Sequence, residues 1–408
     1  MKKIVNCRFC KSKKLKDVIN LGNQFLTGVF PKSKNVKISK GPLSVCLCKN
    51  CGLLQLRHSF NLNEMYGENY GYRSSLNSSM VNHLQNKAIN LIKKFKIKEN
   101  DYIIDIGSND GTFLNAFKGF KNLIGVDPTI KKFKKYYKKN IVTINDFFPS
   151  KKIKEKIKSK KAKLITCISM FYDLEDPLYF VKNIKKCLAK NGVWHFEQSY
   201  MPFMLKQNSY DTICHEHLEY YSLSIIKKIL NKAGLKILDV NFNNINGGSF
   251  SVTATHKKSK IKINNKIINW LLKEEKQMKL LDVNVYKEFN KKIHLHKKSL
   301  LNLLKKLKKN NKSVSGLGAS TKGNVILQYC NINQKLIKNI FEVNKDKFNK
   351  YTPGTKIKIL SDKKINKKNC DYLLVLPWHF KDHIIKKEKK LLNQGIRLIF
   401  PLPQIEIM

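Results

Sequence analysis

The chain has 408 residues, 42% of them apolar, which is enough for two or three domains with their own cores and too apolar for a disordered chain. Its formal net charge of +51 suggests a nucleic-acid partner, but almost all of this charge is lysine, and the only arginines are Arg8, Arg57, Arg73 and Arg397. Because arginine is the usual reader of base edges, we do not expect nucleic acid as the main partner, whereas the charge favours a phosphorylated substrate.

Two further features bear on where the protein works. No apolar run precedes Cys7, and no stretch approaches the roughly 20 apolar residues of a membrane span. The ten cysteines are concentrated near the N-terminus, which suits metal binding in a reducing compartment better than a disulfide framework. We therefore expect a cytoplasmic protein with no membrane association and no obligate protein partner.

Residues 1–60 carry two Cys-x-x-Cys pairs, Cys7 with Cys10 and Cys48 with Cys51. A two-residue gap lets both thiolates of a pair face one ion, so two pairs predict a tetrahedral zinc site. Four thiolates leave no position for water, and the zinc is therefore expected to be structural. Cys46 is a competing ligand, and unrelated buried cysteines are the alternative interpretation.

Residues 61–98 read as a tyrosine-rich connector followed by a helix. The connector holds Tyr66, Tyr70 and Tyr72, and apolar residues at helical spacing follow from Met80 to Phe95. The tyrosines suit either stacking on a substrate or filling the seam between two domains.

Residues 99–255 alternate apolar strands with lysine-rich helical segments. Such alternation predicts an α/β domain with a doubly wound parallel sheet covered on both faces. The expected strands are Tyr102–Ile106, Leu123–Asp127, Ile141–Ile144, Leu164–Ile168 and Gly192–Phe196.

The first of these strands ends in a glycine-rich turn that predicts a nucleoside cofactor. Glycine lets the backbone approach a ligand where a side chain would clash. The residues of the turn that we assign to the cofactor are Asp105, Gly107, Ser108, Asn109 and Gly111.

Two more acidic residues extend this cofactor site. Asp127 ends the next strand, where a carboxylate accepts hydrogen bonds from ribose hydroxyls, and Asp146 follows the third strand, within reach of an adenine amino group. Acidic groups near the turn disfavour a pyrophosphate and suit a cationic cofactor with an amino-acid tail. S-adenosylmethionine fits these residues better than NAD, and a purely structural glycine turn is the alternative.

The run His215-Glu216-His217 concentrates two imidazoles and a carboxylate in three positions. These three residues are compatible with three roles. They could be metal ligands, a general base with the group that orients it, or a hydrogen-bonded polar loop. A histidine near its ordinary pKa of about 6.5 is able to remove a proton next to a carbonyl at neutral pH. The nearby cofactor turn favours the catalytic interpretation.

Residues 256–408 begin with a lysine-rich helical stretch to Lys309 and continue as a second strand and helix alternation. A glycine turn, Gly316-Leu-Gly318-Ala-Ser-Thr-Lys322-Gly323, suits a phosphate held at a helix start with help from Lys322. Expected strands surround Val314, Ile340, Tyr372 and Arg397. This alternation of strands and helices predicts a Rossmann-like α/β domain. The alternative for the glycines is a tight turn with a structural role only.

Several short motifs occur in order along almost the whole chain. They are Cys51-Gly-Leu-Leu-Gln55, Asp105-Ile-Gly-Ser-Asn-Asp-Gly-Thr112, Gly125-Val-Asp-Pro128, Phe196-Glu-Gln-Ser-Tyr200, the His-Glu-His run, Asn246-Gly-Gly-Ser249, Gly318-Ala-Ser-Thr-Lys-Gly323, Tyr351-Thr-Pro-Gly-Thr355 and Phe400-Pro-Leu-Pro403. With these motifs the chain resembles the sugar C-methyltransferases of deoxysugar biosynthesis. That family has an N-terminal zinc-binding domain, a central class I methyltransferase domain and a C-terminal Rossmann-like domain.

The resemblance implies S-adenosylmethionine-dependent C-methylation of a nucleotide-linked keto-deoxysugar, through an enolate. His217 is then the general base, and Glu216 supports it. Tyr72 assists the base or the enolate. Tyr70, His215, Asn246 and Lys322 are the remaining residues assigned to the substrate.

Two positions depart from the family branch that acts at C3 of 4-keto sugars. A tyrosine is expected where the chain has Cys214, and a histidine where it has Asp173. The methylated position therefore stays open. The alternatives are O- or N-methylation of a surface-polysaccharide precursor, a zinc and nucleotide-binding module without catalysis, and nucleic-acid modification.

Overall fold

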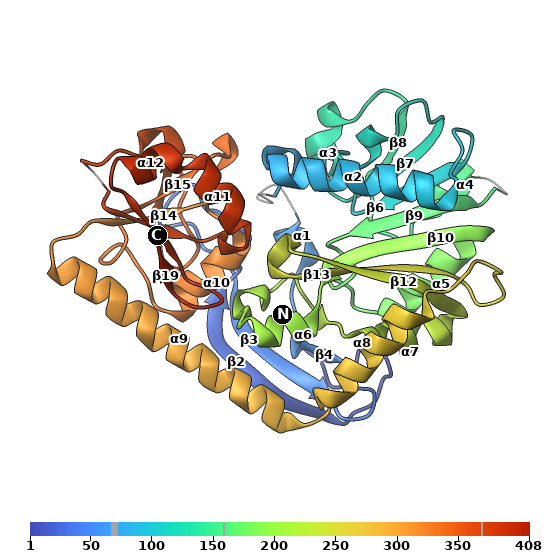
Figure 1. Ribbon diagram of the computed structural model, residues 1–408, viewed down its shortest axis with the longest axis horizontal. Helices are drawn as coiled ribbons and strands as arrows, with labels where there is room; N and C mark the ends of the chain where they lie inside the picture. The colour runs from blue at the N-terminus through green and yellow to red at the C-terminus, as the bar shows by residue number, and fades with distance from the viewer. Residues whose placement is uncertain (67–71, 158–159, 369) are drawn as a thin grey trace.

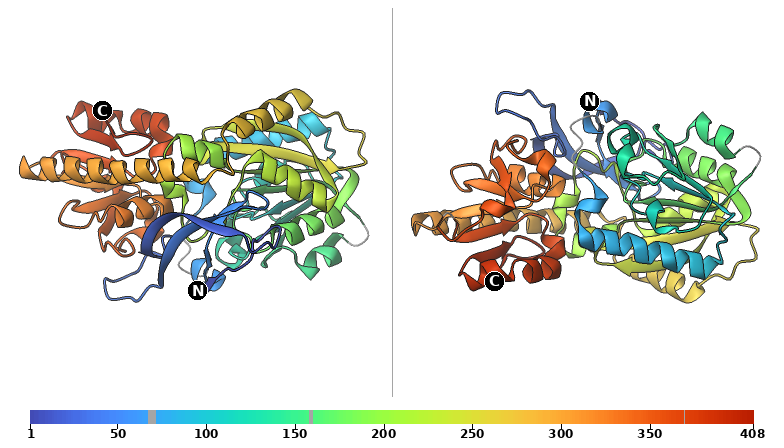
Figure 2. Two further views of the ribbon diagram at one scale, coloured as in Figure 1. Left: turned by 90° about the horizontal axis from the view of Figure 1, so that it is seen from below. Right: turned by 90° about the horizontal axis from the view of Figure 1, so that it is seen from above.

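The computed structural model describes residues 1–66, 72–157, 160–368 and 370–408, so Tyr70 lies outside the described residues. Three larger sheets organise the described residues, beside one two-stranded sheet. Figures 1 and 2 show the C-terminal part at one end, the central sheet at the other, and the N-terminal strands between them. The α/β architecture predicted for the central and C-terminal parts is confirmed.

A curved antiparallel sheet in the order β11-β4-β3-β2 forms the N-terminal part. Its strands are β2 (Leu15–Phe25), β3 (Lys40–Cys48), β4 (Leu54–Leu56) and β11 (Glu219–Tyr220). A short pair, β1 (Lys2–Lys3) with β5 (His58–Ser59), and the helix α1 (Leu62–Met65) complete it. The edge strand β11 comes from far along the chain, directly after the His-Glu-His run.

The central sheet has the strand order β12-β13-β10-β9-β6-β7-β8. Its strands are β6 (Tyr102–Ile106), β7 (Asn122–Val126), β8 (Ile141–Ile144), β9 (Ala162–Ile168), β10 (Leu188–Ser199), β12 (Leu235–Asn243) and β13 (Ser249–His256). The five predicted strands, β6 to β10, are parallel as expected, and β13, which was not predicted, runs antiparallel to both its neighbours. Its connection to β12 is too short for a crossover and permits only an antiparallel pair.

Helices cover both faces of the central sheet (Figure 1). On one face α2 (Ser78–Phe95) buries Met80, Leu84 and Ala88 against apolar strand residues. The other face is covered by α4 (Lys151–Ile157), α5 (Pro177–Cys187), α7 (Leu223–Ala233) and α8 (Asn265–Gln277). Alternate residues of β6 point to opposite faces, since Ile103 belongs to the first core and Ile104 to the second.

Two shorter helices complete the central part, α3 (Ile130–Phe133) and α6 (Met201–Lys206). After the glycine turn the chain forms only a three-residue 3₁₀ turn, Leu114–Ala116, before β7. Glu275 of α8 reaches the start of α7, where its carboxylate accepts from the backbone amide of Ser224 at 2.8 Å and from the Tyr200 hydroxyl at 2.7 Å. These bonds tie α8 to the central sheet.

The C-terminal sheet has the order β16-β15-β14-β17-β18-β19, in which only β19 is antiparallel to its neighbour. Its strands are β14 (Val314–Leu317), β15 (Asn339–Glu342), β16 (Lys358–Ser361), β17 (Tyr372–Val375), β18 (Arg397–Phe400) and β19 (Glu406–Ile407). The helices α10 (Thr321–Tyr329), α11 (Lys381–Lys387) and α12 (Lys389–Asn393) accompany it. The predicted strands correspond to β14, β15, β17 and β18.

A long helix, α9 (Val283–Lys309), joins the parts (Figure 1). It buries Tyr286, Phe289 and Ile293 in one continuous apolar cluster with the N-terminal sheet and the C-terminal sheet. The N-terminal part therefore shares its core with the rest of the molecule. Across the described residues, no helix is both long and apolar enough to cross a membrane.

Candidate active site

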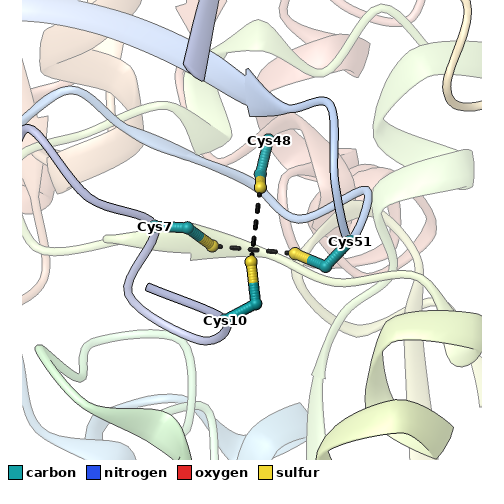
Figure 3. A group of neighbouring side chains, drawn as sticks. All are labelled: Cys7, Cys10, Cys48 and Cys51. Atoms are coloured by element: carbon teal, nitrogen blue, oxygen red, sulfur yellow. Dashed lines mark hydrogen bonds between the residues drawn. The ribbon is translucent and has the colours of Figure 1, made fainter. Parts of the chain in front are cut away.

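The four predicted zinc ligands meet at one point. Figure 3 shows the sulfur atoms of Cys7, Cys10, Cys48 and Cys51 turned toward a common centre, and these atoms lie within 4.8 Å of one another. The Sγ atoms are 3.6 Å apart for Cys7 and Cys51 and 3.5 Å apart for Cys10 and Cys48. Tetrahedral zinc with Zn–S bonds of about 2.3 Å places its sulfurs about 3.8 Å apart, so the group fits zinc. Cys46 lies outside the group, and the full set of thiolates marks the site as structural.

Two residues of the glycine turn after β6 have positive φ angles, a backbone conformation that only glycine adopts easily. Gly107 has φ +72° and Gly111 has φ +76°. A Cβ atom at Gly107 would lie 2.8 Å from the Met170 side chain, and one at Gly111 would lie 2.8 Å from the Tyr137 ring. Both glycines are therefore required for the turn to close against its neighbours.

Acidic side chains stand at the carboxyl ends of the parallel strands β6, β7 and β8. Asp105 is buried and accepts a hydrogen bond from Thr166 Oγ1 at 2.6 Å, and burial raises its pKa to about 7. Asp127 accepts from the backbone amides of Asn109 at 2.9 Å and Thr129 at 2.7 Å. The carboxyl ends of parallel strands are the usual ligand edge of such sheets.

Asp146 lies on the same edge but is engaged locally. Its carboxylate accepts from the Ser150 hydroxyl and from the backbone amide of Phe147, both at 2.8 Å. Ser108, in the glycine turn, forms a hydrogen bond of 2.8 Å between its hydroxyl and that of Tyr137. These contacts order the loops that surround the predicted cofactor position.

The connector before α2 packs on the glycine turn. The backbone amide of Ser74 donates to Asn109 Oδ1 at 3.0 Å, and that of Ser75 donates to Asp110 Oδ2 at 2.9 Å. Asn109 Nδ2 donates to the backbone carbonyl of Tyr72 at 3.3 Å, while the Tyr72 residue remains 47% exposed. Tyr72 thus borders the predicted cofactor site.

The His-Glu-His run forms a tight turn, closed by a hydrogen bond of 3.2 Å from the His217 amide to the Cys214 carbonyl. The turn sends its side chains in different directions. His215 packs edge-on against Phe60 of the N-terminal part, with ring centroids 4.6 Å apart. Burial lowers the pKa of His215 to about 4. This histidine lies in the protein interior rather than beside the other two side chains.

His217 has the arrangement of a fixed, neutral base. Its Nδ1 lies 2.7 Å from the backbone carbonyl of Thr212, which can only accept, so Nδ1 carries the proton and Nε2 keeps its lone pair. The ring lies 4.2 Å from that of Tyr172. Burial lowers the pKa of His217 to about 3, and the nearby Lys322 ammonium adds to this effect. The imidazole is therefore unprotonated at neutral pH.

Glu216 makes its contacts with the N-terminal part. Its Oε2 accepts from Thr27 Oγ1 at 3.3 Å, and a Cβ atom at Gly28 would lie 2.3 Å from its Oε1. The group that orients His217 is the Thr212 carbonyl, whereas the sequence interpretation gives that task to Glu216. Burial raises the pKa of Glu216 and favours its protonated form.

A second acid lies close to Glu216. Asp173 accepts from the Tyr66 hydroxyl at 2.8 Å through Oδ2, and its buried Oδ1 has no hydrogen-bond partner among the described residues. Burial first, and then the proximity of Glu216, raises the pKa of Asp173 well above its ordinary value. Asp173 lies in the segment where a histidine is expected in the family branch that acts at C3 of 4-keto sugars. A carboxyl group therefore takes the place of an imidazole here.

Lys322 enters the same region from the first turn of α10. Its ammonium donates to the Asn246 carbonyl at 2.7 Å and to Thr212 Oγ1 at 3.2 Å, and burial lowers its pKa. Asn246 donates through Nδ2 to Ser169 Oγ at 3.1 Å. A Cβ atom at Gly318 would lie 2.7 Å from Pro377, so this glycine is needed for close packing of the C-terminal turn.

The N-terminal, central and C-terminal parts of the chain therefore meet around His217 and Glu216. The N-terminal part supplies Thr27 and Gly28, the central part supplies His217 and its turn, and the C-terminal part supplies Lys322. Sequence reasoning missed Thr27 and Thr212, which no motif distinguishes from ordinary polar residues, and it gave Tyr66 no role toward Asp173. The one sequence indication for Asp173 is its departure from the expected histidine.

Three family models match successive parts of the chain. Residues 7–66 match the family described as "Putative zinc binding domain", residues 80–240 a methyltransferase domain, and residues 244–403 a C-methyltransferase C-terminal domain. The C-methyltransferase NovU of Streptomyces niveus is 27% identical over 410 residues, covering 99% of this chain and 97% of the relative.

Among solved structures, an S-adenosylmethionine-dependent methyltransferase from Clostridium acetobutylicum is 15% identical, with a TM-score of 0.34 over 43% of this chain and 92% of the other. Magnesium protoporphyrin IX methyltransferase from Synechocystis is 11% identical, with a TM-score of 0.35 over 49% of this chain and 89% of the other.

The central sheet, its glycine turn and the four-cysteine group define an S-adenosylmethionine-dependent methyltransferase with a structural zinc site. Its domains occur in the order zinc-binding, methyltransferase and C-methyltransferase C-terminal. The chain is similar over its full length to a C-methyltransferase, and its last part matches the C-terminal domain of such enzymes.

Proposed function

We propose that this enzyme transfers a methyl group to the carbon next to the ketone of a nucleotide-linked deoxysugar. The observation that carries the proposal is His217, a half-buried imidazole that is neutral and is oriented by the Thr212 carbonyl. Carbon is a poor nucleophile until it loses a proton, so a C-methyltransferase needs a base of this kind. A 4-keto sugar provides an acidic carbon for that base.

The glycine turn and the acidic residues of the central sheet would hold S-adenosylmethionine. When bound, this cofactor supplies a methyl group attached to a positively charged sulfur. Asp127 would accept hydrogen bonds from the ribose hydroxyls, and Asp105, Gly107 and Gly111 would shape the turn around the amino-acid tail. The negative charge of this edge of the sheet suits a cationic cofactor.

His217 would take the proton from the substrate carbon through Nε2, because Nδ1 is held by Thr212. The negative charge then develops on the ketone oxygen of the enolate. Asp173, whose pKa burial raises well above its ordinary value, would donate a hydrogen bond to that oxygen, and Glu216, whose pKa burial also raises, would lie beside it. Tyr66 would hold Asp173 in place, and Tyr72 would border both ligands.

Lys322 would attract the anionic part of the substrate to the seam between the central and C-terminal parts. It is buried, and its two contacts, to Asn246 and Thr212, leave one of its three donors for a ligand. The surrounding positive charge of the chain favours a diphosphate. Such an arrangement would keep a nucleotide sugar with its reactive carbon near His217.

Candidate nucleotide keto-deoxysugars, incubated with enzyme and S-adenosylmethionine, are expected to gain one methyl group by mass spectrometry. NMR spectroscopy is expected to locate this methyl on carbon, and the neighbouring proton is expected to exchange with solvent deuterium. A methyl group found on oxygen or nitrogen, without such exchange, would instead support the alternative methylation of a polysaccharide precursor.

Asp127→Asn is expected to weaken the binding of S-adenosylmethionine about tenfold or more, because a charged acceptor for the ribose hydroxyls is lost. Isothermal titration calorimetry measures this affinity. Asp101→Asn is the control, since Asp101 lies before the opposite end of β6 and its carboxylate accepts from the nearby backbone amide of Lys98. Unchanged affinity in the Asp127 variant would remove Asp127 from the cofactor site.

A further inference from the structure

Arg8 is a buried arginine that lies between the zinc ligands Cys7 and Cys10 in the sequence, and its side chain is 2% exposed. Its Nη1 atom donates to the Leu56 carbonyl at 2.6 Å, and Nη2 donates to Ser59 Oγ at 2.9 Å. These acceptors lie at the end of β4 and in β5. Arg8 therefore fixes the loop between the two zinc ligands against the N-terminal strands.

The same guanidinium also contacts the segment that leads from β9 to α5, residues 169–176, which we call the β9–α5 segment. The Nε atom of Arg8 donates to Glu175 Oε2 at 3.3 Å, and the Glu175 side chain is 49% exposed. Because the arginine is buried, water screens this pair less than it screens a pair of two surface side chains. The contact joins the zinc-binding loop to a segment that lies far along the chain.

The β9–α5 segment carries two residues of the proposed active site. Asp173 is the proposed donor to the enolate oxygen, and the ring of Tyr172 lies 4.2 Å from that of His217. The Tyr172 carbonyl accepts from the backbone amides of Leu218 at 2.8 Å and Glu219 at 3.0 Å, directly after the base. The position of this segment therefore affects both the acid and the base.

We propose that Arg8 is a positioning residue for methyl transfer, which holds the β9–α5 segment against the zinc-binding loop and so keeps Asp173 beside His217. This inference rests on the proposed function. It gives the zinc site a role besides the folding of the N-terminal sheet, since the order that zinc imposes on the Cys7–Cys10 loop reaches the active site through Arg8.

Glu175→Ala tests this contact, because it removes the acceptor and leaves the four cysteines and all proposed site residues in place. Two quantities are measured in the full-length zinc-loaded protein. The backbone amides of Leu218 and Glu219 are expected to exchange with deuterium about tenfold faster, as NMR or mass spectrometry reports. Methyl transfer in a single turnover is expected to slow about tenfold or more, since small displacements of reacting groups have large effects on rate. Zinc content and affinity for S-adenosylmethionine are expected to stay unchanged.

Two further variants show whether the hydrogen bond itself is responsible. Glu175→Gln keeps an acceptor for the Nε atom of Arg8 and is expected to retain most of the rate. Arg8→Lys has a single ammonium group, which cannot replace the spread donors of a guanidinium, so it is expected to slow methyl transfer. The double variant Arg8→Lys/Glu175→Ala is expected to lose no more than Arg8→Lys alone, because residues that act through one contact are not additive. Should Arg8→Lys lose zinc, the two Glu175 variants decide the matter.

Lys11→Ala is the matched control. The Lys11 ammonium lies 2.9 Å from Asp176 Oδ2 and joins the same two segments, but these side chains are 57% and 41% exposed. Exposed ion pairs contribute little, so this variant is expected to leave both exchange and rate unchanged.

Four results would overturn the proposal. They are unchanged exchange in Glu175→Ala, faster exchange without slower methyl transfer, a loss in Glu175→Gln as large as in Glu175→Ala, and loss of zinc from Glu175→Ala. The last would mean that Glu175 supports folding of the zinc-binding loop instead of positioning the β9–α5 segment.

The exchange measurement needs no substrate, and it therefore separates this inference from the proposed function. If the unchanged enzyme does not methylate keto-sugar nucleotides, the proposed function fails. The exchange of Leu218 and Glu219 in the Glu175 variants still shows whether Arg8 holds the β9–α5 segment in place.

Discussion

Replacing His217 with asparagine is expected to lower the rate of methyl transfer about a thousandfold, the usual contribution of a general base. Asparagine keeps an amide N–H that is able to donate to the Thr212 carbonyl, as Nδ1 of the histidine does. It has no atom equivalent to the basic Nε2. The rate is measured in a single turnover with keto-sugar nucleotide, and deuterium entry into the substrate carbon is expected to disappear with it.

His294→Asn is the matched control for this substitution. The Nδ1 atom of His294 also bonds a backbone carbonyl, that of Asn290, at 2.8 Å, but the residue lies on α9 and faces solvent. Its replacement is expected to leave the rate unchanged, and both variants are expected to bind S-adenosylmethionine normally. Nearly full turnover by the His217 variant would show that another group removes the proton.

Replacing Cys48 and Cys51 together with serine is expected to abolish zinc binding and to unfold the N-terminal sheet. Zinc contributes on the order of 10 kcal/mol to the folding of small zinc-binding domains, which exceeds the stability of most domains. Atomic absorption measures the zinc content, and circular dichroism and thermal unfolding report the loss of structure. Turnover is expected to vanish too, because Thr27 and Gly28 of this part contact Glu216.

Cys46→Ser provides the comparison. Cys46 is fully buried on β3 next to the second cysteine pair, but it lies outside the four-cysteine group. Its replacement is expected to keep one zinc ion per chain and to cost about 1–2 kcal/mol for the buried hydroxyl. Binding of S-adenosylmethionine is expected to survive in both proteins, and its loss in the zinc-free protein would mean that the central sheet depends on zinc.

The features that sequence predicts best are those with short, local causes. The two Cys-x-x-Cys pairs predict the zinc group because each pair closes within one turn, and folding only has to bring two pairs together. The strands at Tyr102–Ile106 and Arg397–Phe400 are found where apolar runs and flanking polar residues predict them. The glycine turn at Gly107 and Gly111 follows from the same local reasoning.

Local sequence patterns do not predict the directions in which the His-Glu-His side chains point. Neighbouring residues of a strand alternate between two faces, but a tight turn sends each side chain to a different environment. His215 enters the N-terminal part, Glu216 meets Thr27, and His217 meets Thr212. These partners are set by tertiary packing between residues far apart in sequence. The assignment of His217 as the base and of the other site residues stays a prediction.

The placement of Lys322 illustrates the same limit. Its glycine-rich surroundings suit a phosphate held at a helix start, yet the ammonium is directed to Asn246 and Thr212 in the central part. Only the packing of the C-terminal sheet against the central one determines that direction. Likewise, the antiparallel strand β13, between β12 and β10, follows from a short connection that apolar periodicity alone does not distinguish from a crossover.

The edge strand β11 has a consequence for synthesis of the chain on the ribosome. The N-terminal strands leave the ribosome first, but the neighbour of β4 is Glu219–Tyr220, far later in the sequence. Until those residues emerge, the backbone N–H and C=O groups on the outer edge of β4 are unpaired. Such an exposed edge can pair with strands of other nascent chains. Zinc captured early by the cysteine pairs would hold this incomplete sheet in shape, and the His-Glu-His turn would be drawn into position when β11 joins it.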